Sequence, residues 1–322
     1  MNTVPDKNGM HGHAYTPGAH NGDSPAHSAA SNGARERRQR VRVVTDSASQ
    51  IELGWAHENH VSLLAQKVAF DGQIYHEGID LTDNELAERI INAPPNHWSQ
   101  IQPPSVEDFS NVYRGLLRET SEIVSLHVSS HLSDTLQNAR IAAEEFRGRC
   151  NIAILDSQSV ALGLNILVRK VAQRAQSGMP MDDIVRYARG SVKHVYGAFI
   201  VEDLQYMAHS GCLRPAQAML GEMLGVIPFL TIEEGQIVAI EKVRSVDRAL
   251  EKLVEFAAEF EQPEEMAVLQ LSSRVTDKTA NLLGMLRFTF PKMRDIPLQH
   301  CGATIGSIIG PTGIGVMICE KD

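Results

Sequence analysis

The segment EIVSLHVSSHLSDT, residues 122–135, decides the fold class that the sequence predicts. Its first half is rich in apolar residues, which is typical of a strand that lies in a parallel sheet covered on both faces. Hydroxyl-bearing residues then follow, and an amphipathic helix is expected over residues 134–148. A buried strand, a polar loop and a helix in this order form the repeating unit of an α/β domain.

Similar units lie on either side of this segment. VRVVTDSAS (41–49) and NIAILDSQS (151–159) each predict a strand that ends in a polar loop, and VSLLAQKVAF (61–70) predicts one more strand. Because these apolar strands alternate with amphipathic helices, we expect a mainly parallel sheet flanked by helices.

Two of the expected helices carry clear start signals. One covers residues 81–93 and begins at a cap formed by Thr82 or Asp83. Another begins at Ser105, and Asp108 three residues later completes a pattern like a capping box.

The pattern changes near residue 195, where a second α/β domain with a mixed sheet is expected. It includes a hairpin that turns at Glu234–Gly235. We therefore predict a disordered tail over residues 1–40, an N-terminal α/β domain over 41–195 and a C-terminal α/β domain over 196–322. The tail contains no Leu, Ile, Phe or Trp, so it cannot bury enough apolar surface to offset the entropy lost on ordering.

Composition excludes several classes of protein. The chain has 322 residues, of which 43% are hydrophobic and 21% charged, as expected for a globular protein. Its net charge of −9 argues against a general nucleic-acid binder, which needs a basic surface. Neither a signal peptide nor a membrane span is predicted. The four cysteines form no Cys-x-x-Cys pair, so neither a zinc site nor a disulfide framework is indicated, and a cytoplasmic location is expected.

Hydroxyl and carboxyl groups are concentrated at three junctions between a strand and a loop, residues 45–49, 127–135 and 155–159. Ligands of open α/β sheets bind beyond the carboxyl ends of the strands, so these loops should lie along one edge. The middle loop precedes a helix whose first N–H groups favour an anion such as a carboxylate. It contains Ser129, Ser130, Ser133 and Thr135. Such residues also cap helices, so both interpretations stay open.

Other chemistries have weaker support. Ser129, His131 and Asp134 are close in sequence, but no Gly-x-Ser-x-Gly elbow accompanies them, which argues against a Ser-His-Asp hydrolase. The stretch GSIIGPTGIG (306–315) resembles a phosphate loop superficially, but no Gly-Lys-Ser/Thr follows it. Its four glycines indicate a backbone that closely approaches another part of the molecule.

Seven motifs in order resemble those of the DegV family. They are TDS, QPPSVEDF, SSHLSDT, LDSQSVALG, AQAMLG, EEGQIVAIEKVR and IGPTGIG, and the resemblance covers nearly all of residues 41–322. It implies two α/β domains with a long-chain fatty acid buried between them. Hydroxyl groups at the edge of the first domain would hold the carboxylate of that fatty acid.

The resemblance also implies a role. Bacterial proteins of this kind are fatty-acid-binding partners of a dihydroxyacetone-kinase-like fatty acid kinase, to which they present the carboxylate for phosphorylation. The chain is therefore expected to be a non-enzymatic lipid-binding protein of lipid metabolism. Its ligand would be a fatty acid such as palmitate, with no metal and no other cofactor, and it would have neither a nucleic-acid partner nor an integral membrane segment.

Several family positions are matched in this sequence. The family's Ser-Ser-x-Leu-Ser-Gly-Thr falls on residues 129–135, with Asp134 in place of the glycine. Within it the resemblance makes Ser133 the best candidate for a carboxylate ligand, supported by Ser129, Ser130 and Thr135. Lys242 and Arg244 match a basic pair after the hairpin, and Arg244 is a further candidate ligand-binding residue.

A threonine, a histidine and an arginine of the family are also not matched. The carboxylate-binding threonine of the family's Thr-Ser-Gln-Pro-Ser is here Ile101, and the histidine of its Gly-x-His-x-Gly-Pro-Gly motif is Ile308. The arginine of its Gly-Gly-Arg-Ile-Ser-Lys segment is Cys212. Ile101 and Ile308 are thus expected to line the head of the ligand pocket with apolar rather than polar groups.

These departures affect the polar end of the ligand more than its acyl chain. Burial of a long acyl chain contributes about 0.8 kcal/mol per methylene, on the order of 10 kcal/mol. A lost hydrogen bond to a carboxylate costs about 1.5–3 kcal/mol. Lipid binding is therefore expected to persist with a weaker preference for ionised fatty acid. A pocket re-specialised for a neutral apolar ligand, a hydrolase or acyl-transfer enzyme that uses the serine-rich edge, and a regulatory module that binds a partner protein remain alternatives.

Overall fold

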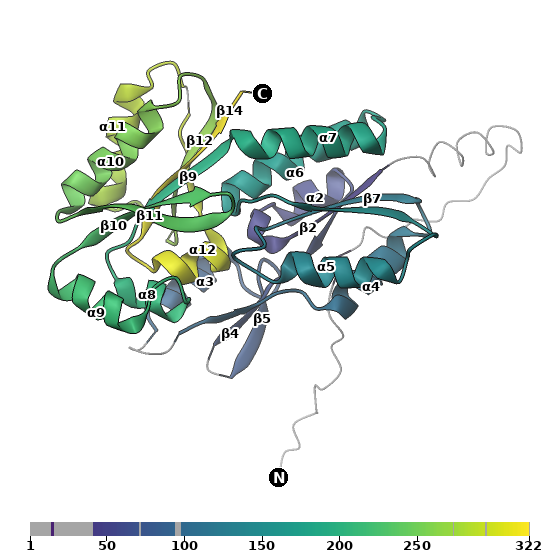
Figure 1. Cartoon of the computed structure of the whole chain (residues 1–322), viewed down its shortest axis with the longest axis horizontal. Helices are drawn as coiled ribbons and strands as arrows, with labels where there is room; N and C mark the ends of the chain where they lie inside the picture. Colours follow the sequence, from purple (N-terminus) through teal and green to yellow (C-terminus); the bar gives the residue numbers. More distant parts are fainter. Residues whose placement is uncertain are drawn as a thin grey trace, which may run out of the picture.

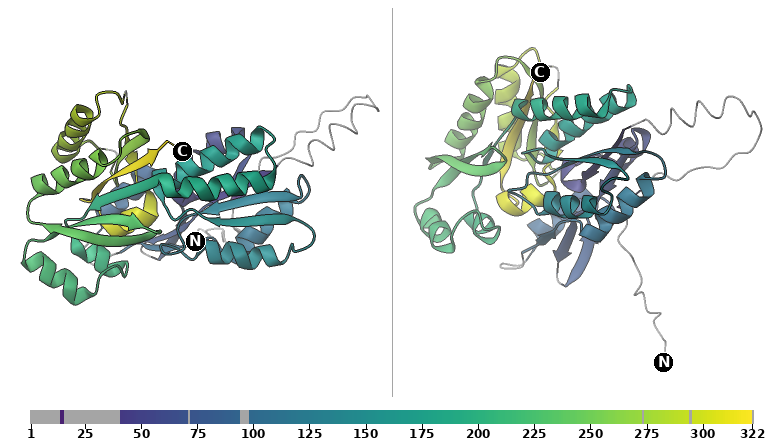
Figure 2. Two further views of the ribbon diagram at one scale, coloured as in Figure 1. Left: turned by 45° about the horizontal axis from the view of Figure 1, so that its top comes forward. Right: turned by 45° about the vertical axis from the view of Figure 1, so that its right-hand side comes forward.

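The computed structural model describes five stretches of the chain and the backbone of one short strand. These are residues 41–70, 72–93, 98–272, 274–293 and 295–321, with Ala14–Tyr15. The described residues form two α/β domains that lie side by side (Figure 1). Figure 2 shows the purple N-terminal strands in one domain and the yellow C-terminal strand in the other. No helix in these stretches is long and apolar enough to cross a membrane.

The sheet of the first domain has five strands. Their order is β1 (Ala14–Tyr15), β3 (Val61–Leu64), β2 (Arg42–Asp46), β7 (Glu122–His127) and β8 (Asn151–Asp156). The pairs from β3 to β8 are parallel, whereas β1 is antiparallel to β3. The disordered tail predicted over residues 1–40 falls outside the described residues, except for β1.

Helices cover both faces of this sheet, as predicted. Side chains alternate along a strand, so Val44 packs under α4 (Val106–Leu116) and α5 (Thr135–Glu144). Its neighbour Val43 belongs to the cluster on the other face. The helices on that face are α2 (Leu53–Glu58), α6 (Ala161–Gln176) and α7 (Met181–Ser191), which η2 (Val192–His194) follows. Burial on both faces explains why the strands are mostly apolar.

Capping boxes start two helices where the sequence predicted them. Thr82 caps α3 (Asp83–Ile91), and the Glu85 side chain accepts a hydrogen bond from the Thr82 backbone N–H. Ser105 caps α4 in the same way, with the Asp108 carboxylate 2.9 Å from the Ser105 backbone nitrogen. Each box pairs two backbone N–H groups that the helix itself leaves without partners.

The sheet of the second domain is mixed. Its order is β11 (Gln236–Val243), β10 (Ile227–Glu233), β9 (Val195–Ile200), β14 (Ile314–Glu320), β12 (Pro263–Gln270) and β13 (Leu298–His300). Only the β12–β13 pair is parallel among these neighbours. Helices α10 (Val246–Ala258) and α11 (Asp277–Thr289) cover its outer face (Figure 1). The hairpin turns at Glu234–Gly235, as predicted, and both residues have positive φ angles, as a tight turn requires.

The segment VSLLAQKVAF does not form the single strand that the sequence predicted. It is divided between β3 and β4 (Lys67–Phe70), and β4 belongs to a separate sheet with β5 (Gln73–His76) and β6 (Gln100–Gln102). The break occurs at Gln66, whose backbone N–H donates to Ser47 Oγ and whose carbonyl accepts from Glu77 N. These contacts replace the strand ladder at that point.

The glycine-rich stretch 306–315 is the end of one helix and the start of a strand, not a phosphate loop. Helix α12 (Gly302–Ile309) lies at the domain junction, and β14 begins at Ile314. A Cβ on Gly315 would collide with the ring of Phe199 on the neighbouring strand β9. The close backbone approach expected from the glycines is therefore present at this position.

The two domains share one hydrophobic core. The largest cluster of buried side chains includes Leu126 and Leu164 from the first domain, Phe199 and Met317 from the second, and Ile305 of α12. Helix α8 (Leu204–His209) packs against α12 at the edge of this junction, and α9 (Pro215–Met223) packs against α8. A continuous apolar cluster therefore extends from one sheet to the other.

Candidate functional site

The three polar loops adjoin at the carboxyl edge of the first sheet, as the sequence predicted. The backbone N–H of Val128 donates to Asp46 Oδ2 at 3.1 Å, which joins the ends of β2 and β7. The Ser130 hydroxyl donates to Asp156 Oδ2 at 2.6 Å, and the Ser129 N–H donates to the Ser159 carbonyl at 2.9 Å. Hydrogen bonds therefore connect the ends of β2, β7 and β8 into one edge.

The four hydroxyl residues of the middle loop have different surroundings. Ser129 is buried, and its hydroxyl donates to the Gly235 carbonyl at 2.7 Å. This hydrogen bond connects the serine loop to the hairpin of the second domain. Ser130 is exposed, and its hydroxyl donates a hydrogen bond to the Asp156 carboxylate. Ser133 is half-buried, and its hydroxyl lies 2.8 Å from that of Thr135, the buried first residue of α5. When one of two hydroxyl groups donates its proton to the other, the accepting hydroxyl still has a proton that it can donate to a third group.

Ser133 also has a structural contact, because its hydroxyl accepts the Thr135 backbone N–H at 3.3 Å. Ser133 is not the N-cap of α5, which is Asp134 and makes no capping hydrogen bond with its side chain, so Ser133 supports the first helical N–H from one position outside the helix. Only one of the two hydroxyl protons is used within the Ser133–Thr135 pair, so the other can donate to a ligand.

Ile101 and Ile308 lie in the apolar core next to this edge. Ile101, on β6, is half-buried and packs against the main hydrophobic cluster, and Ile308, on α12, is buried within it. β6 and α12 are in contact with each other. Leu132, from the serine loop, packs against the same cluster. β6 and α12 thus bring the two isoleucines near each other, and the serine loop reaches the same continuous cluster through Leu132.

Arg244 is not brought to this region. The turn at Gly235 contacts Ser129, whereas Arg244 follows the far end of β11 and is exposed. A strand rises about 3.3 Å per residue, so the length of β11 separates Arg244 from the serine loop by roughly 26 Å. Cys212 is also exposed, in the loop between α8 and α9.

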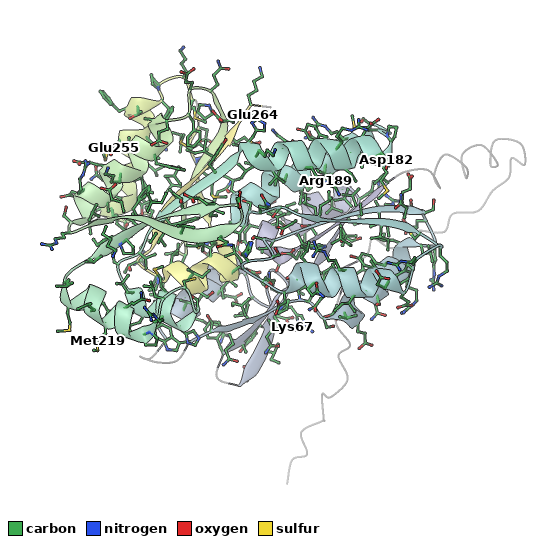
Figure 3. The ribbon with its side chains drawn as sticks, viewed as in Figure 1. Lys67, Asp182, Arg189, Met219, Glu255 and Glu264 are labelled. Carbon is green, nitrogen blue, oxygen red and sulfur yellow. The ribbon has the colours of Figure 1, made fainter. Side chains whose placement is uncertain are left out.

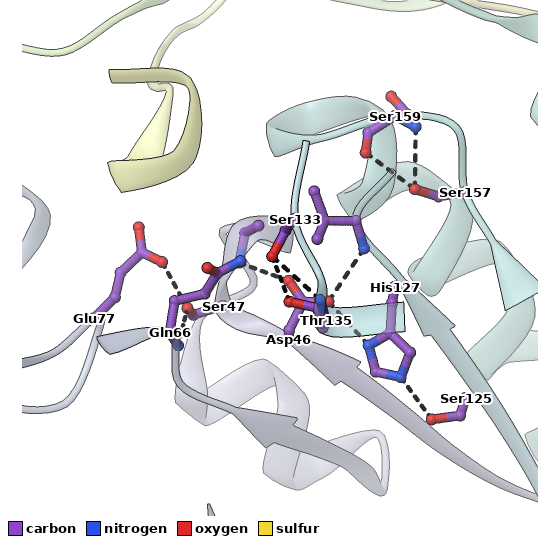
Figure 4. Close-up of polar contacts among 12 residues, drawn as sticks. Asp46, Ser47, Gln66, Glu77, Ser125, His127, Ser133, Thr135, Ser157 and Ser159 are labelled. Carbon is purple, nitrogen blue, oxygen red and sulfur yellow. Dashed lines mark hydrogen bonds and ion pairs between the residues drawn. The ribbon is translucent and has the colours of Figure 1, made fainter. Parts of the chain in front are cut away.

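A buried polar chain that the sequence did not reveal holds the edge together (Figure 4). His127 Nδ1 lies 2.9 Å from Asp46 Oδ2, its Nε2 lies 2.6 Å from Ser125 Oγ, and Ser125 Oγ lies 2.8 Å from the Tyr113 hydroxyl. All four side chains are fully buried, and burial raises the pKa of Tyr113. The order Asp-His-Ser is that of a hydrolase triad, but no substrate can reach a fully buried Ser125.

The Ser129, His131 and Asp134 set does not form a triad either. The Ser129 hydroxyl donates to a backbone carbonyl, and the His131 ring lies 3.4 Å from the Gln236 side chain. A triad needs the serine hydroxyl on the histidine ring. Within the described part of the chain, no group of three or more His, Cys, Asp or Glu side chains is placed to hold a metal ion.

Glu77 is the second buried group that the sequence did not single out. Its carboxylate accepts hydrogen bonds from Ser47 Oγ at 2.6 Å, Gln50 Nε2 at 3.2 Å and the Ala303 backbone N–H at 2.6 Å. It therefore joins η1 (Ser47–Ser49) to the first turn of α12. Burial raises the pKa of Glu77, although the hydrogen bonds from Ala303 and Ser47 oppose this shift. A single glutamate before a glycine carries no pattern that would have predicted this role.

Comparison with known proteins agrees with this architecture. A family model described as "Uncharacterised protein, DegV family" matches residues 40–321. The chain belongs to the DegV family. A DegV domain-containing protein of Streptomyces coelicolor is 29% identical over 284 residues, which are 87% of this chain and 99% of that protein.

Two solved DegV structures share the two-domain fold. The structure titled "Fatty Acid Binding of a DegV family Protein" from Thermus thermophilus is 27% identical, with a TM-score of 0.75 over 88% of this chain and 100% of that one. The structure of DegV, "a fatty acid binding protein" from Bacillus subtilis, is 25% identical, with a TM-score of 0.75 over 88% and 99% of the two chains. The resemblance found in the seven motifs is thereby confirmed.

Proposed function

We propose that this DegV chain binds a long-chain fatty acid or a similar acyl lipid and carries out no bond-making chemistry on it. One observation carries the proposal. The Ser133–Thr135 hydroxyl pair lies at the start of α5, and Leu132 of the same loop packs against the core that both domains share. A hydroxyl pair that can donate one more hydrogen bond, next to an extended apolar interior, fits a lipid with a single polar end. The fatty-acid-binding relatives from Thermus thermophilus and Bacillus subtilis add support.

The energetics favour binding through the acyl chain. Each methylene removed from water contributes about 0.8 kcal/mol, and a long chain contributes on the order of 10 kcal/mol before the entropy of association is subtracted. The head contacts contribute less. We therefore assign Ser133 and Thr135 to positioning the head group, with Ser129 and Ser130 fixing the loop that carries them. Arg244 has no part in this assignment.

Presentation of the lipid to a dihydroxyacetone-kinase-like fatty acid kinase is the second part of the proposal. It rests on the family resemblance, and a cytoplasmic location belongs to it. We expect the chain, loaded with fatty acid, to support formation of acyl phosphate when such a kinase and ATP are added. Acyl phosphate formed equally well without this chain would contradict a presenting role.

Native mass spectrometry combined with lipid extraction tests the binding proposal. The purified full-length chain should carry co-purified acyl species, and lipid added after delipidation should raise its melting temperature. At a free ligand concentration of 100 Kd the gain is about 2.7 kcal/mol in the free energy of unfolding. The absence of acyl species from several preparations, together with an unchanged melting temperature, would refute lipid binding.

A further inference from the structure

Five residues at the domain junction carry buried side-chain polar atoms that find no hydrogen-bond partner within the described stretches. Gln66 is fully buried, and both its amide oxygen and its amide nitrogen are unpaired. The other unpaired atoms are Thr45 Oγ1, Ser49 Oγ, Gln50 Oε1 and Thr304 Oγ1. Buried polar groups in folded proteins are nearly always paired, and an unpaired one destabilises the fold. Six such atoms therefore call for a partner that the described residues do not supply.

The five residues that carry these atoms stand on segments that meet at one place: the end of β2 with η1, the break at Gln66, and the first turn of α12. The centre of this place is Ser47, whose hydroxyl donates to Glu77 and accepts from the Gln66 backbone N–H (Figure 4). Thr45 and Ser49 stand two positions before and after Ser47, and the Gln50 side chain contacts Glu77 directly. Thr304 follows Ala303, the residue whose N–H reaches Glu77. We call this group, Thr45, Ser49, Gln50, Gln66 and Thr304, the amide–hydroxyl cluster.

The cluster adjoins the two isoleucines at the head of the expected lipid pocket. Thr304 and Ile308 are four residues apart in α12, so they lie on the same face of that helix one turn apart. Gln66 stands two residues before Val68, which pairs with Ile101 across β4 and β6. Where the family resemblance places a threonine and a histidine, this chain has Ile101 and Ile308. The unpaired polar atom of Thr304 lies on the same helix as Ile308. The unpaired atoms of Gln66 directly precede β4, the strand that pairs with the β6 strand of Ile101.

The charged groups around the amide–hydroxyl cluster indicate which lipid head group the cluster can bind. The cluster offers hydroxyl and amide N–H donors together with two amide carbonyl acceptors. The charged groups nearest Glu77 are the carboxylates of Asp46 and Asp83, and His300 lies near Asp83. His127 is engaged by Asp46, Lys67 on β4 (Figure 3) is paired with Asp108 at 3.0 Å, and Cys301, the N-cap of α12, is buried. A carboxylate only accepts hydrogen bonds, so it would leave the Gln66 and Gln50 carbonyls unpaired and would add a negative charge beside Glu77.

We propose that the amide–hydroxyl cluster binds the uncharged head group of a long-chain lipid, one that both donates and accepts hydrogen bonds, such as a hydroxyl or a primary amide. This inference rests on the proposed lipid binding and specifies its head group. An uncharged head pairs with the donors and the acceptors at once and adds no charge next to Glu77. In this chain the head of the pocket thus selects by hydrogen bonding and not by charge.

A comparison of three ligands with the same acyl chain tests the proposal. Hexadecan-1-ol, hexadecanamide and hexadecanoate are each titrated into the delipidated full-length chain at neutral pH, and displacement of a fluorescent acyl probe is measured. We expect the alcohol and the amide to bind about tenfold or more tightly than the carboxylate, a difference of about 1.4 kcal/mol. Equal or tighter binding of hexadecanoate would overturn the inference and leave lipid binding itself intact. If none of the three binds, the proposed function fails instead.

The variant Gln66→Leu separates a ligand contact from a structural role. We expect it to weaken hexadecanamide binding about tenfold and to change hexadecanoate binding much less. The melting temperature of the lipid-free variant should stay the same or rise, because leucine replaces an unpaired buried amide with an apolar group of similar size. Thr304→Val, which removes one hydroxyl, should act in the same direction. Gln137→Leu on the exposed face of α5 is the matched control and should change neither quantity.

If Gln66→Leu lowers the melting temperature of the lipid-free chain and leaves the affinities for all three ligands unchanged, the cluster is satisfied by internal water and plays a structural part only. That outcome would overturn the inference.

Discussion

Single residues show two different ways of keeping a carboxylate buried. Asp46 is paired with His127 at 2.9 Å and accepts two backbone N–H groups, from Ala48 and Val128. Glu77 has three hydrogen-bond donors but no cation among its described contacts. Hydrogen bonds offset only part of the cost of removing a charge from water. Glu77 should therefore respond to pH in the folded state.

Replacement of Glu77 tests this expectation. Burial raises its pKa above the ordinary value of 4.5, so the folded chain holds the proton more tightly than the unfolded chain. The free energy of unfolding should consequently fall as the pH rises from about 4.5 through the folded pKa. In Glu77→Gln that decline should be smaller, because the amide does not ionise. Urea unfolding over this pH range measures it, with Glu52→Gln, at an exposed position, as the control. Identical slopes in wild type and Glu77→Gln would contradict the prediction.

Ser133 either binds the lipid head or only supports the start of α5. Ser133→Ala should weaken lipid binding about tenfold, because a hydrogen-bond partner is lost, while the loss of the contact to the Thr135 N–H costs about 0.5–2 kcal/mol of stability at most. Ser133→Asp keeps an acceptor for that N–H and adds a negative charge. It should weaken hexadecanoate binding more than hexadecan-1-ol binding in the same displacement assay. Wild-type affinity for both lipids in Ser133→Asp would mean that Ser133 is structural.

At the scale of elements, the β10–β11 hairpin connects the two domains. Its turn places the Gly235 carbonyl on the Ser129 hydroxyl, and a Cβ on Gly235 would collide with that hydroxyl. Gly235 has a φ of +84°, in the left-handed region that favours glycine. The hairpin thus depends on glycine for two separate reasons, its backbone conformation and its contact.

Alanine substitutions can separate these two reasons. Gly178, after α6, has a φ of +80°, and a Cβ there would meet nothing within 4 Å. Gly178→Ala should therefore cost about 1–2 kcal/mol, the strain of the left-handed conformation alone. Gly235→Ala should cost clearly more and should also weaken lipid binding, because Ser129 must move. Chemical denaturation and the probe-displacement assay measure the two effects. Equal losses of stability with unchanged lipid binding would show that the contact with Ser129 is unimportant.

At the scale of the whole molecule, the shared core connects the domains more strongly than the hairpin does. Residues of both sheets and of α12 belong to the same buried cluster, and Glu77 is bonded to the first turn of α12. Unfolding of one domain would expose apolar surface of the other, at about 25 cal/mol per Å². Independent stability of the two halves is therefore not expected.

This arrangement predicts a single thermal transition for the lipid-free chain. The calorimetric enthalpy of unfolding should equal the van't Hoff enthalpy, and tertiary and secondary structure should be lost together. Added lipid should shift the transition upwards without dividing it. Two resolved transitions, of which only one moves on addition of lipid, would contradict the shared core.

Features that depend on residues close together in the chain could be predicted from the sequence alone. The capping boxes at Thr82 and Ser105 and the turn at Glu234–Gly235 were predicted because their hydrogen bonds and backbone angles involve residues at most a few positions apart. The alternation of apolar strands with amphipathic helices predicted the fold class for the same reason. The seven ordered motifs indicated the family.

Contacts between residues far apart in the chain could be seen only in the folded structure. Asp46 and His127 are 81 positions apart, and Glu77 and Ala303 are 226 apart, so no local pattern connects them. The division of residues 61–70 between two sheets likewise depends on Ser47 and Glu77, which engage the backbone of Gln66 and end the ladder there. Buried polar groups require partners wherever the topology brings them, and among the described residues the Gln66 amide has none.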